Sequence, residues 1–379
     1  MHPYLRYAID RKAEIIDLIR RFVECESPSD SPADVNRFVD LLTESTSDIA
    51  AAKTFKAAAF GKHVRLDFKL PRRPKQNRIL GVAHSDTVWP LGTLKTMPFR
   101  NEKGRLWGPG VYDLKAGIVF FLYAVRCLRD LDVAPGRKIS LLVVSDEEVG
   151  SKSSRPITEA EAKQSDYVLV LEPGTGMEGK LKTARKGVGA YTISIEGKAA
   201  HAGVDFAKGA SAIVEAARQI EKIVGFTNLQ RGTTVNPGII SGGTRRNVIA
   251  AEACVAVDVR VSRLKDAETL DKKFRALRPF DKRCKVHVEG GLNRPPMERT
   301  KAIAGLFAKA KQIGAEMGMR LEESSTGGGS DGNFTAALGV PTLDGLGAVG
   351  EGAHALNESV LIDRIADRTA LLAGLLAGL

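Results

Sequence analysis

The stretch L-L-V-V-S-D-E-E-V-G-S, from Leu141 to Ser151, decides the fold of this chain. Four apolar residues suited to a buried strand lead directly into three carboxylates, Asp146, Glu147 and Glu148. A strand interior cannot bury three like charges, because desolvation and mutual repulsion both oppose it. We therefore expect these carboxylates at the end of a strand, where they face either water or a cation.

Three further segments have the apolar runs of strands, and segments with helical spacing separate them. The predicted strands are H-V-R-L-D-F-K-L at 63–70, the run R-I-L-G-V-A-H that ends at His84, and D-Y-V-L-V-L, which ends at Glu172. Helices are predicted near 10–24, 33–50, 116–128 and 156–164. This alternation is typical of an α/β fold with a mainly parallel sheet covered by helices, in which ligands gather beyond the carboxyl ends of the strands.

Side chains that can bind metal collect at those strand ends. His84, Glu172 and the acidic cluster all end strands, and Asp113 opens a helix in G-P-G-V-Y-D-L-K-A-G. Singly, each has an ordinary explanation, such as a solvated loop or, for Asp113, a helix N-cap. Together with His354 in a glycine-rich loop, they supply imidazole and carboxylate ligands without thiolate, the set that a hydrolytic zinc pair requires.

Two local spacings add to this interpretation. In H-S-D, Asp86 can accept the imidazole N–H of His84, which would fix the tautomer and leave the other nitrogen for a metal. Glu147 and Glu148 are adjacent, so their side chains can diverge on a loop, one binding metal while the other holds a water.

From about residue 184 the pattern becomes that of a small α+β domain. The segments are A-Y-T-I-S-I-E-G, a helix at 209–223, T-T-V-N-P-G-I-I-S-G-G, V-I-A-A-E-A-C-V-A-V-D-V-R-V, a helix at 265–277 and K-V-H-V-E-G-G. Their order is the split βαβ arrangement of ferredoxin-like folds. We predict that residues 184–296 are inserted into a catalytic domain made of residues 1–183 and 297–379.

Composition argues against several classes of protein. No run of about 18 apolar residues occurs in the 379 residues, so we expect no membrane span. The net charge of +11 is scattered apart from R-R-P-K-Q-N-R at 72–78, which favours anionic small substrates over nucleic acid. Four cysteines without a C-x-x-C pair argue against a disulfide framework. The N-terminus resembles no signal peptide, which predicts a cytoplasmic protein, or a periplasmic one if such a peptide has been removed.

The motifs resemble those of a known enzyme family. They are H-S-D-T-V, G-P-G-V-Y-D-L-K-A-G, D-E-E-V-G-S, L-E-P, G-K-A-A-H-A-G, N-V-I, D-V-R, T-G-G-G-S-D and G-x-G-A-H-x-x-x-E. They resemble, in order, those of the dizinc metallopeptidase family of aminoacylases, acetylornithine deacetylases and glutamate carboxypeptidases, above all the bacterial folate-cleaving glutamate carboxypeptidases. The resemblance covers nearly the whole chain and implies a zinc exopeptidase-like catalytic domain with an inserted ferredoxin-like dimerisation domain.

The resemblance also implies how two Zn²⁺ ions bind to each subunit. Asp113 would bridge the two ions. His84 and Glu172 would complete one site, and Glu148 and His354 the other. Co²⁺ or Mn²⁺ could replace Zn²⁺, because such ligand sets tolerate several divalent ions.

Three further residues would take part in catalysis. The resemblance makes Glu147 the general base and Asp86 the partner of His84. His201, in G-K-A-A-H-A-G, would reach the active site of the partner subunit, so that a homodimer formed by the inserted domain is the catalytic unit. On the residues alone, His201 could equally be a turn histidine.

Besides the metal ligands and the catalytic residues, some residues match positions that hold the substrate's carboxylate in the family. They are Asn247, Arg260 and the glycines Gly327, Gly328 and Gly329. The guanidinium suits a carboxylate because of its bidentate fork, and glycines let backbone N–H groups approach closely. Without the resemblance, Arg260 could form a strand-end salt bridge and the glycines a flexible loop.

Two departures from the family pattern concern the substrate. Ser324 and Ser325 stand where folate-cleaving relatives have an Arg before T-G-G-G, and Ala250 stands where the family usually has Pro. The missing Arg bears on selectivity for glutamate, and Arg245 and Arg246 are candidates to replace it.

The sequence therefore predicts a zinc-dependent hydrolase of an amide or peptide bond adjacent to a free carboxylate, which releases a C-terminal amino acid such as glutamate. The alternative is an N-acyl amino-acid deacylase of the acetylornithine deacetylase or succinyl-diaminopimelate desuccinylase type. A metal-free binding protein of the same family would lack a ligand or the base, and none is missing from this sequence.

Overall fold

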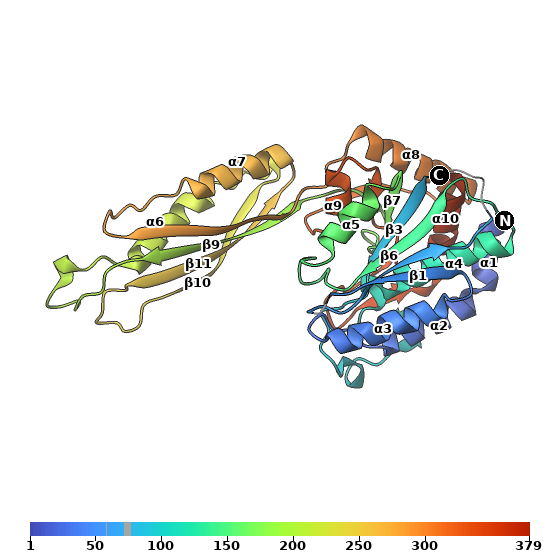
Figure 1. Cartoon of the computed structure of the whole chain (residues 1–379), viewed down its shortest axis with the longest axis horizontal. Coiled ribbons are helices and arrows are strands. Elements are labelled where there is room, and N and C mark those ends of the chain that lie inside the picture. Colours follow the sequence, from blue (N-terminus) through green and yellow to red (C-terminus); the bar gives the residue numbers. More distant parts are fainter. Residues whose placement is uncertain (58, 72–76) are drawn as a thin grey trace. The chain divides into compact units, whose positions relative to one another are not determined.

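The computed structural model describes residues 1–57, 59–71 and 77–379, so most of the basic segment at 72–78 lies outside the described residues. The chain forms two compact units (Figure 1). Unit 1 contains residues 1–184, 299–325 and 330–379, and unit 2 contains residues 185–298 and 326–329. The sequence analysis did not predict that residues 326–329 belong to unit 2.

Unit 1 is built on a mixed six-stranded sheet in the order β1-β2-β6-β3-β7-β14. The strands are β1 (Ala50–Phe55), β2 (His63–Phe68), β3 (Arg78–His84), β6 (Lys138–Val144), β7 (Tyr167–Val170) and β14 (Thr342–Leu343). β3 pairs in parallel with β6 and β7, and β7 pairs in parallel with β14. β1 and β2 form an antiparallel hairpin that also pairs antiparallel with β6. The predicted α/β fold is confirmed, with this hairpin at one edge.

Helices cover both faces of this sheet (Figure 1). They are α1 (Pro3–Asp10), α2 (Lys12–Glu24), α3 (Pro32–Ser45), α4 (Ala116–Asp130), α5 (Arg155–Ala162), α8 (Lys301–Glu316), α9 (Gly332–Ala337) and α10 (Ile365–Gly378). Successive strand residues point to opposite faces. Ile79, Leu141 and Leu169 accordingly join the core beneath α2, α3, α4 and α10, whereas Leu80 and Leu142 join a second cluster with Ala162 of α5. Burial on both faces explains the continuous apolar runs of these strands.

The predicted helix at 33–50 is wrong at its carboxyl end. α3 ends at Ser45, and Ala50 already begins β1. The hydroxyl of Thr46 donates to the carbonyl oxygens of Leu42 and Thr43, so the side chain satisfies carbonyls that a continuing helix would have bonded. In the described part of the chain, no helix combines the length and hydropathy needed to cross a bilayer.

Two small sheets complete this part of the chain. One has the order β15-β16-β5-β4, from β15 (Gly350–Glu351), β16 (Ser359–Leu361), β5 (Arg105–Trp107) and β4 (Arg100–Glu102). It joins the segment before Asp113 to the segment that carries His354. The other pairs β8 (Leu181–Arg185) with β13 (Glu323–Thr326).

Unit 2 has the predicted ferredoxin-like topology. Its strands are β9 (Gly187–Glu196), β10 (Thr234–Gly242), β11 (Glu252–Val261) and β12 (Lys285–Arg294), in the order β10-β11-β9-β12. All three pairings are antiparallel. The helices α6 (Ala212–Val224) and α7 (Leu264–Arg275) contribute Ala216 and Phe274 to a core with Ile193 and Val257 of the strands.

Candidate metal centre

The carboxyl ends of β3, β6 and β7 bring distant residues to one edge of the sheet. His84 is the last residue of β3 and lies opposite Val144, the last residue of β6. The acidic cluster therefore begins beside His84. β7 ends at Val170, and Glu172 follows two residues later at the same edge.

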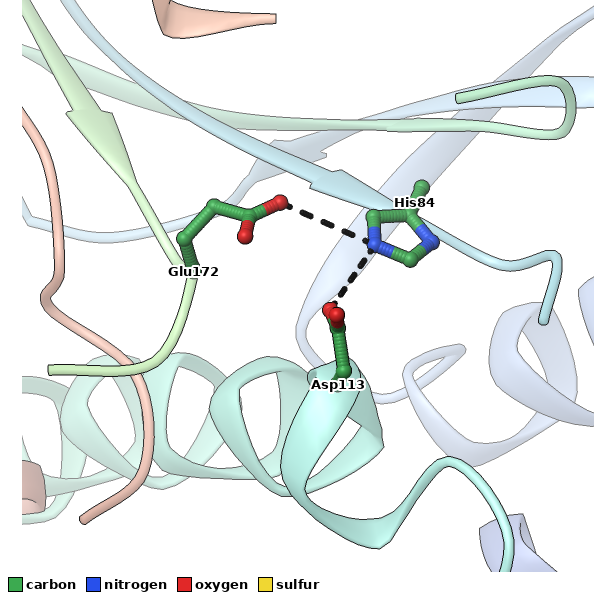
Figure 2. A group of neighbouring side chains, drawn as sticks. All are labelled: His84, Asp113 and Glu172. Atoms are coloured by element: carbon green, nitrogen blue, oxygen red, sulfur yellow. Dashed lines mark hydrogen bonds and ion pairs between the residues drawn. The ribbon is translucent and has the colours of Figure 1, made fainter. Parts of the chain in front are cut away.

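The first candidate metal group consists of His84, Asp113 and Glu172. Nε2 of His84 lies 3.3 Å from Oδ1 of Asp113 and 3.7 Å from Oε1 of Glu172. Figure 2 shows both carboxylates approaching this one nitrogen. The other ring nitrogen, Nδ1, donates to the backbone carbonyl oxygen of Asp86 at 2.8 Å, so Nε2 is left as the metal-binding atom.

The second group consists of Asp113, Glu148 and His354. Nε2 of His354 lies 3.4 Å from Oδ2 of Asp113 and 3.3 Å from Oε1 of Glu148. Asp113 thus uses one oxygen toward each histidine. His354 has a φ of 61°, a left-handed conformation that few non-glycine residues adopt and that often marks functional positions.

The spacing of these atoms fits divalent metals better than direct hydrogen bonds. Two ligands that each lie 2.0–2.2 Å from a tetrahedral Zn²⁺ are separated by about 3.4 Å. The four nitrogen–oxygen distances of 3.3, 3.7, 3.4 and 3.3 Å scatter around that value. Oε1 of Glu148 is also buried without a well-aligned hydrogen bond. All five predicted ligands therefore come together in two groups that share Asp113.

The neighbouring charges in the two groups shift the pKa values of both histidines and of Asp113. Asp113 and Glu148 raise the pKa of His354 to about 10. Burial alone would lower the pKa of His84, but Asp113 and Asp86 outweigh burial and raise it well above its usual value. Burial would likewise raise the pKa of Asp113, but His354 and His84 hold it well below its usual range. The neighbouring carboxylates thus favour the protonated form of both imidazoles, and a metal bound there would have to displace those protons.

Asp86 makes more contacts than the predicted one with His84. Its carboxylate Oδ1 lies 3.5 Å from Nδ1 of His84, and its backbone carbonyl oxygen lies closer to that nitrogen, at 2.8 Å. The carboxylate also accepts the backbone N–H groups of Glu147 and Glu148, each at 3.2 Å, and the hydroxyl of Ser29 at 2.8 Å. Asp86 therefore links the β3 end to the acidic loop. Glu147 belongs to neither metal group among the described residues.

His63, which the sequence analysis did not single out, binds the loop that follows β6 and contains Asp146, Glu147 and Glu148. Its Nδ1 accepts the backbone N–H of Ser145 at 3.0 Å, so Nε2 carries the proton and donates to the Ser153 hydroxyl at 3.1 Å. That hydroxyl in turn donates to Asp146 at 2.7 Å. One buried imidazole thus holds both ends of the loop that carries Glu147.

Glu358 is a second residue to which the sequence analysis gave no role, although it ends one of the quoted motifs. Its carboxylate is fully buried and accepts four N–H groups: Trp89 Nε1 at 2.7 Å and the backbone N–H of Gly110, Tyr112 and Asp113 at 2.9, 2.9 and 3.1 Å. Burial raises the pKa of Glu358 to about 7, and these donors act in the opposite direction. The signal was present as the Glu of G-x-G-A-H-x-x-x-E.

The remaining predicted residues all lie in unit 2. His201 and Asn247 are on adjoining loops, since the N–H of Ala202 donates to the carbonyl oxygen of Asn247 at 3.0 Å. Both side chains belong to exposed residues. Nδ1 of His201 accepts the N–H groups of Gly203 and Val204, as a turn histidine does.

Arg260 meets the glycine run. Its guanidinium pairs with Asp258 at 2.9 Å, the salt bridge considered as its alternative role, and donates to the carbonyl oxygen of Gly327 at 3.3 Å. The carbonyl oxygens of Gly328 and Gly329 accept from Arg185 at 3.2 and 3.1 Å. Arg260 and Arg185 therefore both lie at the glycine loop, and the loop turns its carbonyl oxygens, not its N–H groups, toward them.

A helix-covered mixed sheet with two histidine–carboxylate groups at its carboxyl edge is the architecture of a metal-dependent hydrolase. Residues 82–378 match the sequence model of Peptidase family M20/M25/M40, and the chain belongs to this family. It is therefore a hydrolase of the peptidase and amidohydrolase type.

Individual relatives cover nearly the whole chain. Carboxypeptidase G2 from Pseudomonas sp. (strain RS-16) is 30% identical over 356 residues, which cover 92% of this chain and 84% of that protein. Succinyl-diaminopimelate desuccinylase from Beijerinckia indica is 27% identical over 399 residues, which cover 96% and 98%. The crystal structure of aminopeptidase PepT from Bacillus cereus has a TM-score of 0.79 and 22% identity over 97% and 98% of the two chains, and so shares the fold.

Proposed function

We propose that this protein is a two-zinc carboxypeptidase that hydrolyses the amide bond next to a free carboxylate and releases a C-terminal amino acid, with glutamate as the leading candidate. The supporting observation is that Asp113 directs separate oxygens toward two histidines, because such a carboxylate can bridge two ions. His84 and Glu172 would complete one site, and Glu148 and His354 the other.

The chain's own residues then account for the proton transfers. When bound, the metal pair supplies Lewis-acid polarisation of the scissile carbonyl and a water of lowered pKa. Glu147 takes the proton from the attacking water as the water oxygen bonds to the scissile carbon. It returns that proton to the leaving nitrogen as the C–N bond breaks. Asp86 keeps Glu147 in place, since it accepts the backbone N–H of that residue.

Arg260 and Asn247 would hold the free carboxylate of the substrate. The side chain of Arg260 is 33% exposed, and a guanidinium can hold a carboxylate through its bidentate fork. Loss of this carboxylate from the substrate should therefore cost more than loss of any apolar side chain.

A substrate panel tests this function. The zinc-loaded protein is assayed on acyl-glutamates, on amides of other C-terminal amino acids and on N-acetyl and N-succinyl amino acids, each beside the same compound with its free carboxylate converted to a carboxamide. We expect the highest kcat/KM for release of glutamate and a loss of about 10- to 100-fold for each carboxamide, because a hydrogen bond to a charged group contributes about 1.5–3 kcal/mol. Absence of metal-dependent hydrolysis of every compound would refute the proposal.

The second candidate function is N-acyl amino-acid deacylation. The desuccinylase from Beijerinckia indica favours it, because its similarity extends over 96% of this chain. The bond cleaved and the roles of Glu147 and the metal ligands are the same in both functions. Higher kcat/KM for N-acetyl or N-succinyl amino acids than for acyl-glutamates would establish this alternative.

We also propose that unit 2 forms a homodimer and that His201 acts in the partner's active site. β10 is an edge strand of the unit 2 sheet, and an unpaired edge can pair with another chain. Apolar side chains remain uncovered on and near it: Ile239 is 70%, Phe206 71% and Val204 76% exposed. Such uncovered apolar groups are typical of an interaction surface.

A further inference from the structure

Glu358 contacts two segments that hold candidate metal ligands and itself lies in the third. Trp89, which donates to Oε2 at 2.7 Å, follows the β3 end that carries His84. Asp113 and its neighbours donate three backbone N–H groups. Glu358 itself stands four residues after His354, next to β16. All of these residues belong to unit 1.

The chemistry of the contact requires a carboxylate. Oε1 accepts the N–H groups of Tyr112 and Asp113, and Oε2 accepts those of Gly110 and Trp89. An ionised carboxylate offers about four acceptor sites and no donor, so all four N–H groups are satisfied at once. An amide of the same shape would turn two donors toward two of these N–H groups.

The backbone N–H groups that donate to Glu358 belong to the segment that orients the side chain of Asp113. Asp113 lies in an extended conformation, with φ of −116° and ψ of 92°, directly before α4, and its own N–H is one of the four. The hydrogen bond from Lys115 N–H to the carbonyl oxygen of Gly110 at 3.0 Å spans this residue, but the N–H of Asp113 itself donates to Glu358, so that carboxylate restrains the residue directly. The two oxygens of Asp113 can then face His84 and His354 separately.

We propose that Glu358 is a positioning residue of the metal centre: it fixes the backbone of Asp113 against the segment that carries His354, and so sets the affinity of the metal held by both. This inference rests on the proposed two-metal function. It assigns Glu358 no contact with substrate or metal.

The test compares Glu358→Gln with Glu161→Gln. Glu161 is a matched control, since it is also a buried carboxylate of unit 1 but pairs with Arg65 and Arg78. Zn²⁺ bound per subunit is titrated by calorimetry and counted by elemental analysis, and unfolding of the metal-free proteins is measured in parallel. We expect Glu358→Gln to weaken one of the two sites about 10- to 100-fold, as loss of a ligand-orienting partner does, and to lower kcat with little change in KM.

If Glu358→Gln binds Zn²⁺ at both sites with wild-type affinity, the inference is overturned, whatever the stability of the variant. Glu358 would then have a purely structural role. If Glu358→Gln does not fold, Glu358→Asp keeps the charge on a shorter side chain, and it should weaken the same single site while Glu161→Gln does not. Two wild-type affinities in Glu358→Asp would then overturn the inference. Absence of metal binding in the wild type would refute the proposed function instead, so the two failures are distinguishable.

Discussion

Oδ1 of Asp86 lies 3.2 Å from the backbone nitrogen of Glu147, and this contact ties the end of β3 to the loop that follows β6. Its partner oxygen, Oδ2, accepts the next N–H, that of Glu148. One carboxylate therefore holds the backbone of both the proposed base and a proposed metal ligand.

Asp86→Asn should lower kcat by about 10- to 100-fold, the range seen when a partner of site residues is lost, while both metals remain bound. The amide keeps one oxygen, so one of the two N–H groups loses its acceptor, whereas the backbone carbonyl oxygen that orients His84 is unchanged. Kinetics and metal analysis check this result. Ser29→Ala, which removes the hydroxyl contacts to Asp86 and to the carbonyl oxygen of Thr87 but leaves both acceptor oxygens of Asp86, is the matched control and should have a smaller effect. Wild-type kcat in Asp86→Asn would contradict the assignment.

Glu147→Gln and Glu148→Gln form a matched pair on adjacent residues. Glu147→Gln should lose about 10²- to 10⁴-fold in kcat, the usual contribution of a general base, and keep both metals. Glu148→Gln should lose the metal shared with His354, because the amide removes a charged ligand from the second group. Activity and metal content are measured on both. Full turnover by Glu147→Gln, or two tightly bound metals in Glu148→Gln, would reverse these roles.

Metal binding should tighten as the pH rises. The pKa of His354 is raised to about 10 and that of His84 well above its usual value, so at neutral pH the metal-free imidazoles are protonated. Filling both sites should release about two protons. Calorimetry in buffers of different ionisation enthalpy measures this number. No proton release at pH 7 would show that the imidazoles are neutral before metal arrives.

Stability of the metal-free protein should have the opposite pH dependence. A histidine whose folded pKa is raised stabilises the fold fully below its unfolded pKa, and that contribution is lost as the pH rises through the folded value. The free energy of unfolding should therefore fall between about pH 6.5 and pH 10 through His354. Denaturant titrations of the wild type and of His354→Gln across this range check the slope, which should be shallower in the variant. Equal slopes would assign the effect to other groups.

Gly117→Ala should destabilise the protein and disturb the first metal group. A Cβ at this position of α4 would lie 2.5 Å from the carbonyl oxygen of Leu171, the residue before Glu172. Because backbone must then shift, we expect a loss of about 1–3 kcal/mol, together with weaker metal binding. Gly305→Ala in α8 is the control, since its Cβ meets nothing within 4 Å. That variant should be stabilised by about 0.4–1 kcal/mol in thermal unfolding. Equal stability of the two variants would contradict the packing argument.

Complementation tests the proposed dimer. Glu147→Gln and His201→Ala should each be inactive alone, because each lacks one part of a shared site. When the two variants are mixed and allowed to exchange subunits, half of the dimers are mixed and each has one intact site, so activity should recover to about a quarter of wild type. No recovery, with subunit exchange demonstrated by mass, would place His201 in its own subunit's site or outside catalysis.

Much of the fold was predictable because the strands are buried on both faces. Continuous apolar runs that end in polar residues, such as the one from Leu141 to Asp146, mark both the strand and its carboxyl end. The parallel pairing of β3 with β6 then places His84 beside the acidic loop. The helix limit near Thr46 was missed because the apolar Ile49 and Ala50 continue the helical pattern while a hydroxyl hydrogen bond ends the helix.

The supporting residues of the site could not be predicted in the same way. Glu358 acts on a backbone N–H 246 residues away in sequence, and His63 on one 82 residues away. Glu358 stood in the motif G-x-G-A-H-x-x-x-E, but neither that spacing nor the sequence around His63 shows which distant N–H groups these residues accept, because the tertiary fold brings the partners together. The spacing of Asp86 from His84 predicted the contact between its carboxylate and the imidazole, but not that its carbonyl oxygen would lie closer to the same nitrogen.

The position of unit 2 within the chain has a consequence for biosynthesis. Four of the five candidate ligands precede residue 185, whereas His354 follows the whole of unit 2. A nascent chain emerging from the ribosome therefore presents the His84 group long before the second group can form. The second group is therefore complete only once the segment that carries His354 has been synthesised and has packed against the rest of unit 1.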